Sequence, residues 1–166
     1  MNRATFEDAP GRLDRGSPLA VVDIGSNSVR LVVYEGLARA PTALFNEKAL
    51  CGLGREVQTT GLLAADAVEQ ALAALKRYRA LCSTMGSKRV LAIATAACRD
   101  AKNGPAFIKL AEAIIGTEIE LLSGAREAEA KIRGFQGPVF AQAREGDPEE
   151  IQLEAVRAAA AVAEAQ

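Results

Sequence analysis

A short turn between two apolar runs contains the first residues of this sequence that could do chemistry. The stretch VVDIGSNSVRLVVYE, residues 21–35, is interrupted by an aspartate, a glycine and small polar residues. The turn consists of Gly25, Ser26, Asn27 and Ser28. Glycine takes backbone conformations closed to other residues, and successive amides with two hydroxyls form a cradle for a phosphate. Asp23 is placed to hold a divalent cation beside that phosphate. A plain hairpin with an aspartate cap fits the same residues equally well.

Two charged residues follow later apolar runs. Arg99 comes after the run at 88–97, and its planar guanidinium suits two phosphate oxygens at once. The alternative is an exposed arginine paired with Asp100. Glu127 follows Ser123, a plausible helix N-cap. It could orient and deprotonate a water molecule, or it could be an acid in the first turn that the helix dipole favours.

The order of periodic segments predicts an α/β domain that places these groups. Strands are expected at 18–25, 29–35, 42–54, 88–97 and 117–124, and helices at 63–83, between Asn103 and Gly116, and at 123–135. A three-strand meander followed by helix, strand, helix, strand and helix gives a mixed sheet with helices packed on it. In this topology the Gly25 turn, Arg99 and Glu127 emerge near one edge of the sheet.

Composition excludes several classes of protein. The 166 residues contain 20 basic and 21 acidic side chains, so no broad field attracts nucleic acid or an anionic membrane. No histidine is present, which excludes Ser-His-Asp and Cys-His catalysis. No apolar run reaches the ~20 residues of a membrane span. The three cysteines are widely spaced, and we expect reduced, mostly buried thiols in a cytoplasmic protein. They are Cys51, Cys82 and Cys98.

The chain divides into three parts by composition. Residues 1–17 have mixed charge and no apolar core, which predicts a disordered lead rather than a signal peptide. Residues 18–135 account for the whole α/β layout. Residues 136–166 combine a polar, turn-rich stretch with an alanine-rich helix whose apolar stripe is thin. This tail could dock, pair with another chain or fray, so homo-oligomerisation is left open.

Four blocks together resemble one family. They are VVDIGSNSVRLVVYE, CGLGREVQTTGLLAADAVEQALAALKRYRALC, VLAIATAACRDAKNGPAFI and EIELLSGAREAEAKIRG, in this order. Their order and spacing are similar to the exopolyphosphatase/guanosine pentaphosphate phosphohydrolase (Ppx/GppA) family over residues 18–135. The resemblance implies an actin-like, ribonuclease-H-like ATPase fold and hydrolysis of a terminal phosphoanhydride of polyphosphate or pppGpp with Mg²⁺. It implies Gly25–Ser28 as phosphate loop, Asp23 on the metal side, Arg99 on the cleaved phosphate and Glu127 as catalytic base.

The sequence departs from this family after residue 134. A second ribonuclease-H-like half with a D-x-G-G-G-S loop is expected there, and position 126 is Arg where a second Glu is usual. We therefore expect a truncated or frameshifted gene product, a deliberate fragment or a diverged half-protein, which is weakly active or inactive alone. A non-catalytic module that binds a phosphate ligand or a partner is the alternative. A kinase fragment of the same superfamily fits the SNSVR and SGAREAEA blocks less well.

Overall fold

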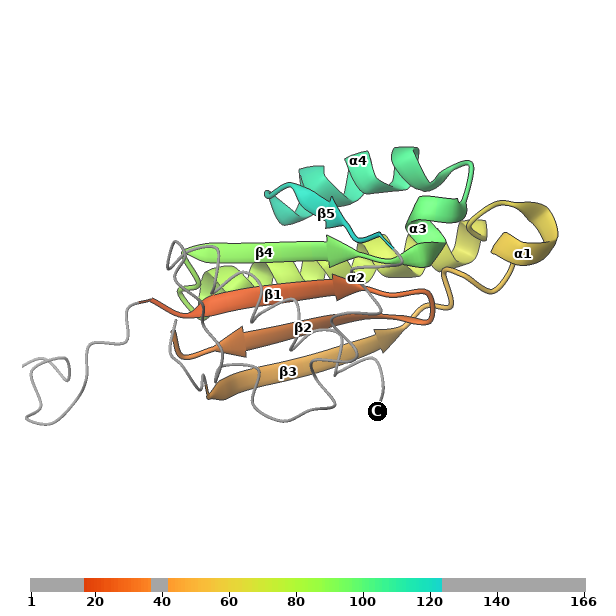
Figure 1. The fold of residues 1–166 in the computed structure, drawn as a ribbon. Helices are drawn as coiled ribbons and strands as arrows, with labels where there is room; N and C mark the ends of the chain where they lie inside the picture. The colour runs from red at the N-terminus through yellow and green to blue at the C-terminus, as the bar shows by residue number, and fades with distance from the viewer. Residues whose placement is uncertain (1–16, 37–41, 124–166) are drawn as a thin grey trace, which may run out of the picture.

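One five-stranded sheet with helices packed against it forms the part of the protein that the computed structural model describes, residues 17–36 and 42–123. The elements in chain order are β1 (Leu19–Ile24), β2 (Ser28–Tyr34), β3 (Ala43–Leu50), α1 (Val57–Thr60), α2 (Ala65–Thr84), β4 (Arg89–Ala94), α3 (Ala96–Asp100), α4 (Gly104–Ile115) and β5 (Ile119–Leu121). The strand order is β3-β2-β1-β4-β5 (Figure 1). This confirms the predicted α/β class.

Strand direction decides which loops meet. β1 pairs antiparallel with β2, and β2 pairs antiparallel with β3, which is the predicted meander. β4 pairs parallel with both β1 and β5. The carboxyl ends of β1, β4 and β5 therefore lie at one edge of the sheet, and the β1–β2 turn and α3 both begin there (Figure 1). In open α/β sheets this edge is where ligands bind.

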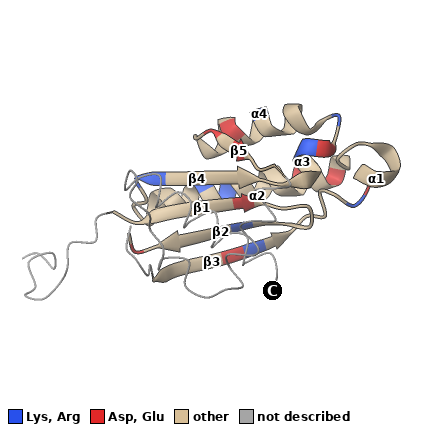
Figure 2. Cartoon of the chain, viewed as in Figure 1, with Lys and Arg blue, Asp and Glu red and all other residues tan. Residues whose placement is uncertain are grey.

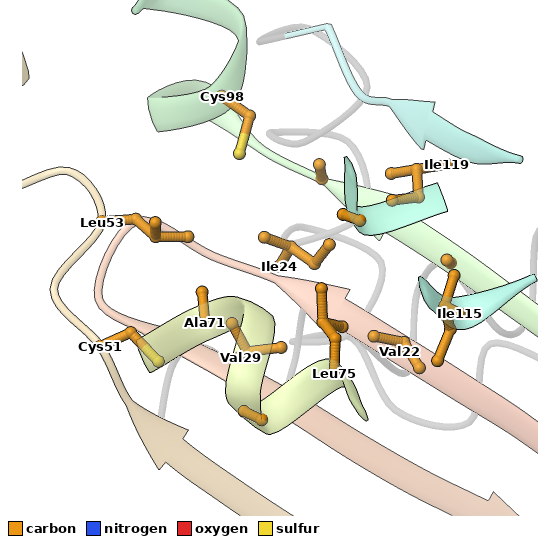
Figure 3. Packing of buried hydrophobic residues seen from close by; sticks show 14 of the residues in the cluster. Val22, Ile24, Val29, Cys51, Leu53, Ala71, Leu75, Cys98, Ile115 and Ile119 are labelled. Carbon is orange, nitrogen blue, oxygen red and sulfur yellow. The ribbon is translucent and has the colours of Figure 1, made fainter. Parts of the chain in front are cut away.

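The main core lies between one face of the sheet and helices α2 and α4. β1 is buried along its whole length, as its unbroken apolar run predicts. Val22 and Ile24 face α2 and pack with Leu75, whereas Val21 belongs to a smaller cluster on the opposite face (Figure 3). The buried residues of α2 recur every three or four positions, as in an amphipathic helix. They are Ala67, Ala71, Ala74, Leu75, Tyr78 and Cys82.

Three predicted strands run too long. The strand expected at 117–124 is β5, which spans only Ile119–Leu121. The strand expected at 42–54 ends at Leu50, because the amides that follow bind the β1–β2 turn instead of continuing a ladder. The strand expected at 88–97 ends at Ala94, because the carbonyl of Thr95 accepts from the amides of Cys98 and Arg99 and so begins α3. The short helices α1 and α3 were not predicted. The helix between Asn103 and Gly116 is confirmed, and Gly116 ends it in the left-handed conformation.

The three cysteine side chains are free thiols and buried, as predicted. In the described ranges, no helix combines the length and the apolar character that crossing a bilayer requires.

Tyr78 and Cys98 make the folded state sensitive to alkaline pH. The Tyr78 hydroxyl donates to the carbonyl of Val29 at 3.0 Å. Burial raises the pKa of Tyr78 from 10.0 to about 12 and the pKa of Cys98 from 9.0 to about 12. The unfolded chain therefore loses these protons first as pH rises. We expect the free energy of unfolding to be fully retained below pH 9. Above pH 9 it should fall by about 1.4 kcal/mol per pH unit through Cys98, and above pH 10 by as much again through Tyr78, until both groups ionise in the folded state near pH 12.

Urea titrations at increasing pH measure this loss. The Tyr78→Phe variant is the matched control, because it lacks the titrating hydroxyl. It should be about 1 kcal/mol less stable at neutral pH, for want of the hydrogen bond to Val29, and should lose stability less steeply above pH 10. A urea midpoint that stays constant up to about pH 11 contradicts the expectation.

Candidate active site

The β1–β2 turn is held by a loop that follows β3. The Gly54 amide donates to the carbonyl of Ser26 at 2.7 Å. The amides of Cys51 and Gly52 both donate to the carbonyl of Asn27, at 3.0 and 2.8 Å. We call Cys51–Gly54 the brace. Both exposed peptide carbonyls of the turn are thus occupied by the brace.

Peptide planarity converts these contacts into a direction for the amides. In a trans peptide the carbonyl and the following N–H point to opposite sides. The amides of Asn27 and Ser28 therefore point away from the brace. Within residues 17–36 and 42–123, the amides of Ser26 and Asn27 donate to no protein group, and both residues are exposed. The amide of Asn27 is therefore both unpaired and directed away from the brace, and such a donor beside small hydroxylic residues is suited to an anion.

Gly25 does not play the conformational part that the sequence suggested. Its φ is not among the positive values of the described glycines, so the prediction of a backbone conformation closed to other residues is wrong there. Gly25 is buried, and its amide donates to the carbonyl of Ser28 at 2.9 Å across an ordinary two-residue turn. The ladder between β1 and β2 simply continues to Gly25 and Ser28, so no unusual φ is required.

Hydrogen bonds tie together the strand ends at this edge. The Thr95 amide donates to the carbonyl of Ile24 at 3.1 Å, which joins the end of β4 to the end of β1. The Leu122 amide donates to the carbonyl of Ala94 at 2.9 Å, which joins the segment after β5 to β4. These bonds fix the ends of β1, β4 and β5 relative to one another, and with them the β1–β2 turn, α3 and Ser123, which follow these strands.

Arg99 lies on α3 at this edge. Its Nη1 donates to the carbonyl of Leu122 at 2.9 Å, and its Nε donates to Oδ1 of Asp100 at 2.9 Å. Figure 2 shows the basic and acidic residues side by side on α3. The pairing with Asp100 confirms the structural alternative for Arg99. A third of the side chain, 33%, stays exposed, so contact with a ligand remains open to it.

Asp23 is a buried carboxylate close to the turn, 5% exposed. It lies on the sheet face opposite α2, because its neighbours Val22 and Ile24 point into the main core. Across the β1–β2 ladder it stands opposite Arg30. One carboxylate together with hydroxyls, waters and substrate phosphates is a donor set that Mg²⁺ uses, so the chemistry fits a hydrated ion. No group of three or more His, Cys, Asp or Glu in the described ranges could hold a metal by itself.

The structure brings some of the predicted residues together. The turn Gly25–Ser28, Asp23 and Arg99 belong to the same edge of the sheet. Glu127 and the helix expected at 123–135 lie outside the described residues, apart from Ser123, which is exposed. The role of Glu127 therefore stays a prediction.

Three residues that support the site were missed in the sequence. Gly54 contacts the turn. The side chain of Asn103 accepts from the Leu63 N–H at 2.8 Å through Oδ1 and donates to the Leu63 carbonyl at 3.0 Å through Nδ2. Gly104 lies against the carbonyl of Cys98 in α3. The Gly-Leu-Gly at 52–54 was the available signal, since closely spaced glycines often mark a close approach of two backbones.

The domain has the actin-like, ribonuclease-H-like ATPase fold. Its marks are the strand order, the tight turn after β1 and the common edge at the carboxyl ends of β1, β4 and β5. The sequence profile of the Ppx/GppA phosphatase family matches residues 18–145. The chain belongs to this family.

Two solved structures and one further sequence relative are similar to this chain. An exopolyphosphatase from Cytophaga hutchinsonii is similar with a TM-score of 0.66 and 32% identity, covering 72% of this chain and 38% of that one. The Ppx/GppA family member of Aquifex aeolicus has a TM-score of 0.64 and 29% identity, covering 72% of this chain and 40% of that one. Exopolyphosphatase 2 of Mycobacterium tuberculosis is 33% identical over an alignment of 128 residues, and the match covers 72% of this chain and 40% of the relative. The chain thus spans well under half the length of these relatives.

Proposed function

We propose that this chain is the N-terminal lobe of a phosphohydrolase that acts on terminal phosphoanhydride bonds of inorganic polyphosphate or pppGpp. The observation that carries the proposal is the orientation of the turn: the brace occupies the carbonyls of Ser26 and Asn27, and the Asn27 amide is left unpaired and directed away from it. Arg99 lies at the same edge of the sheet as this turn. It is the arginine of α3, and its side chain is partly exposed. Relatives named exopolyphosphatases favour polyphosphate as the substrate.

The residues have distinct parts in this proposal. Phosphoryl transfer depends on positioning and charge stabilisation more than on covalent chemistry. The amides and hydroxyls of the turn hold the non-bridging oxygens, and Arg99 holds the phosphate that is cleaved. Glu127 orients the attacking water and accepts its proton. Mg²⁺, held on the side of Asp23, neutralises charge on the phosphate oxygens when it is bound.

A non-catalytic phosphate-binding module is the second candidate. It is favoured by what the described residues supply at the edge of the sheet, namely the unpaired Asn27 amide and the partly exposed Arg99, which are groups that bind phosphate. A single preorganised electrostatic contact is often worth ~10²-fold in rate, so a lobe that lacks contacts from a partner lobe would bind phosphate and turn it over slowly.

Titration with tripolyphosphate and an assay of phosphate release from polyphosphate, both with and without Mg²⁺, test the proposal. We expect Mg²⁺-dependent binding and slow release. Glu127→Gln should remove the release and leave the affinity unchanged, because a general base acts on water rather than on the bound phosphate. Absence of binding at millimolar tripolyphosphate would overturn the proposal. Binding without release favours the non-catalytic module, and release unaffected by Glu127→Gln would exclude that residue as the base.

A further inference from the structure

Gly54 occupies a gap between the two elements that bear the candidate phosphate ligands. A Cβ atom added to Gly54 would lie 2.9 Å from Cβ of Ser26 in the β1–β2 turn and 3.3 Å from Cβ of Ala97 in α3. It would also lie 3.4 Å from the carbonyl oxygen of Ser26. Its φ is not positive, so the glycine is required for space rather than for backbone conformation. The turn and α3 therefore approach each other as closely as they do because position 54 has no side chain.

The backbone at Gly54 also takes part in orienting the turn. Its amide donates to the carbonyl of Ser26 at 2.7 Å, the shortest of the three bonds from the brace. That bond, through the planar peptide, directs the Asn27 amide to the far side of the turn. A residue that moved the backbone at position 54 would rotate this peptide, and with it the donor that faces the ligand.

The brace is itself held by its neighbours. The amide of Arg55 donates to the carbonyl of Gly52 at 3.1 Å, and the amide of Val57 donates to the carbonyl of Gly54 at 3.2 Å. The Arg55 guanidinium pairs with Asp66, at the start of α2. Leu53, the residue before Gly54, is fully buried in the main core and restrains the loop further. A side chain added at position 54 is therefore expected to displace the turn or α3 as well as the loop.

We propose that Gly54 is a positioning residue that sets the spacing between the amides of the β1–β2 turn and the guanidinium of Arg99 for a common phosphate ligand. The inference rests on the proposed function, since it assigns both elements to one anion site. Arg99 follows Ala97 by two residues in the five-residue helix α3, so displacement of Ala97 displaces the guanidinium as well. Misplacement of a binding group by about 1 Å can cost up to ~10²-fold in function.

The test is the affinity of the whole 166-residue chain for tripolyphosphate with Mg²⁺, measured by titration calorimetry. Gly54→Ala should weaken binding at least about tenfold. Gly86→Ala is the matched control: it has φ +69° and open space around it, and it lies after α2, at the other end of β4. The control should lose thermal stability through its backbone strain and should bind as the wild type does.

A double-mutant cycle separates positioning from a general loss of stability. Ser26→Gly removes the Cβ atom nearest to the added methyl group. In the Ser26→Gly background, Gly54→Ala should weaken binding by a clearly smaller factor than in the wild-type background, because the 2.9 Å contact is gone while the 3.3 Å contact with Ala97 remains. This comparison still decides the matter if Gly54→Ala alone does not fold. An equal affinity loss in both backgrounds, or wild-type affinity of Gly54→Ala, overturns the inference. If the wild type itself does not bind, the proposed function fails first, so the two failures are distinguishable.

Discussion

The Gly104→Ala variant is expected to lose at least about 3 kcal/mol of folding free energy, more than an ordinary overpacking substitution. A Cβ atom at Gly104 would lie 1.9 Å from the carbonyl oxygen of Cys98 and 2.9 Å from its carbonyl carbon. These are backbone atoms of α3, so no side-chain rotation relieves the overlap. Either α3 moves with its Arg99, or α4 loses its first turn. Thermal unfolding followed by circular dichroism measures the loss.

Gly116→Ala is the control for this variant, at the other end of the same helix. Gly116 has φ +79°, and an added Cβ atom would meet only the flexible end of the Arg79 side chain at 3.3 Å. Alanine there should cost about 1 kcal/mol, through backbone conformation alone. Equal stability losses for Gly104→Ala and Gly116→Ala would contradict the steric explanation.

The Arg99→Met variant is expected to bind tripolyphosphate roughly 10- to 100-fold more weakly, because a charge-assisted hydrogen bond contributes about 1.5–3 kcal/mol. Methionine keeps much of the aliphatic stem and removes the guanidinium. Arg99→Lys keeps the charge without the planar fork, so its affinity should be intermediate. Binding should also weaken as salt rises, since the site is partly exposed.

Arg79→Met is the control for the loss of one positive charge. Arg79→Met removes one exposed arginine from α2, beside Gly116 and so at the edge opposite α3, and should leave the affinity unchanged. Arg99→Met also loses the hydrogen bond to the carbonyl of Leu122, so its affinity is measured well below its melting temperature. Wild-type affinity in Arg99→Met would mean that the role of Arg99 is structural, through its hydrogen bonds to Asp100 and to the carbonyl of Leu122.

Local pattern was sufficient for much of the fold. The unbroken apolar run of β1, the meander of three strands, the periodicity of α2 and the Gly116 stop of α4 all follow from rules that act over a few residues. The same rules placed Arg99 after a central strand. The four blocks identified the family, because their order along the chain is itself a property of the sequence.

Where those rules failed, contacts between distant segments decided the outcome. The residues at 51–54 continue the pattern of a strand, yet their amides bind the carbonyls of Ser26 and Asn27. Asn103 stands at the start of α4, but its side chain pairs with Leu63, 40 residues away, instead of capping the helix.

The sequence by itself determined the five strands and the two long helices α2 and α4, in their order, and which residues at the strand ends have the chemistry to bind phosphate. Only the tertiary structure decided that the carbonyls of Ser26 and Asn27 face the brace and that the Asn27 amide points away from it. It also decided that Gly54 and Gly104 leave room for α3 beside the turn. The physical reason is that helix and strand periodicity arise from neighbouring residues, whereas hydrogen-bond partners and free space depend on backbones that meet only when the sheet has assembled.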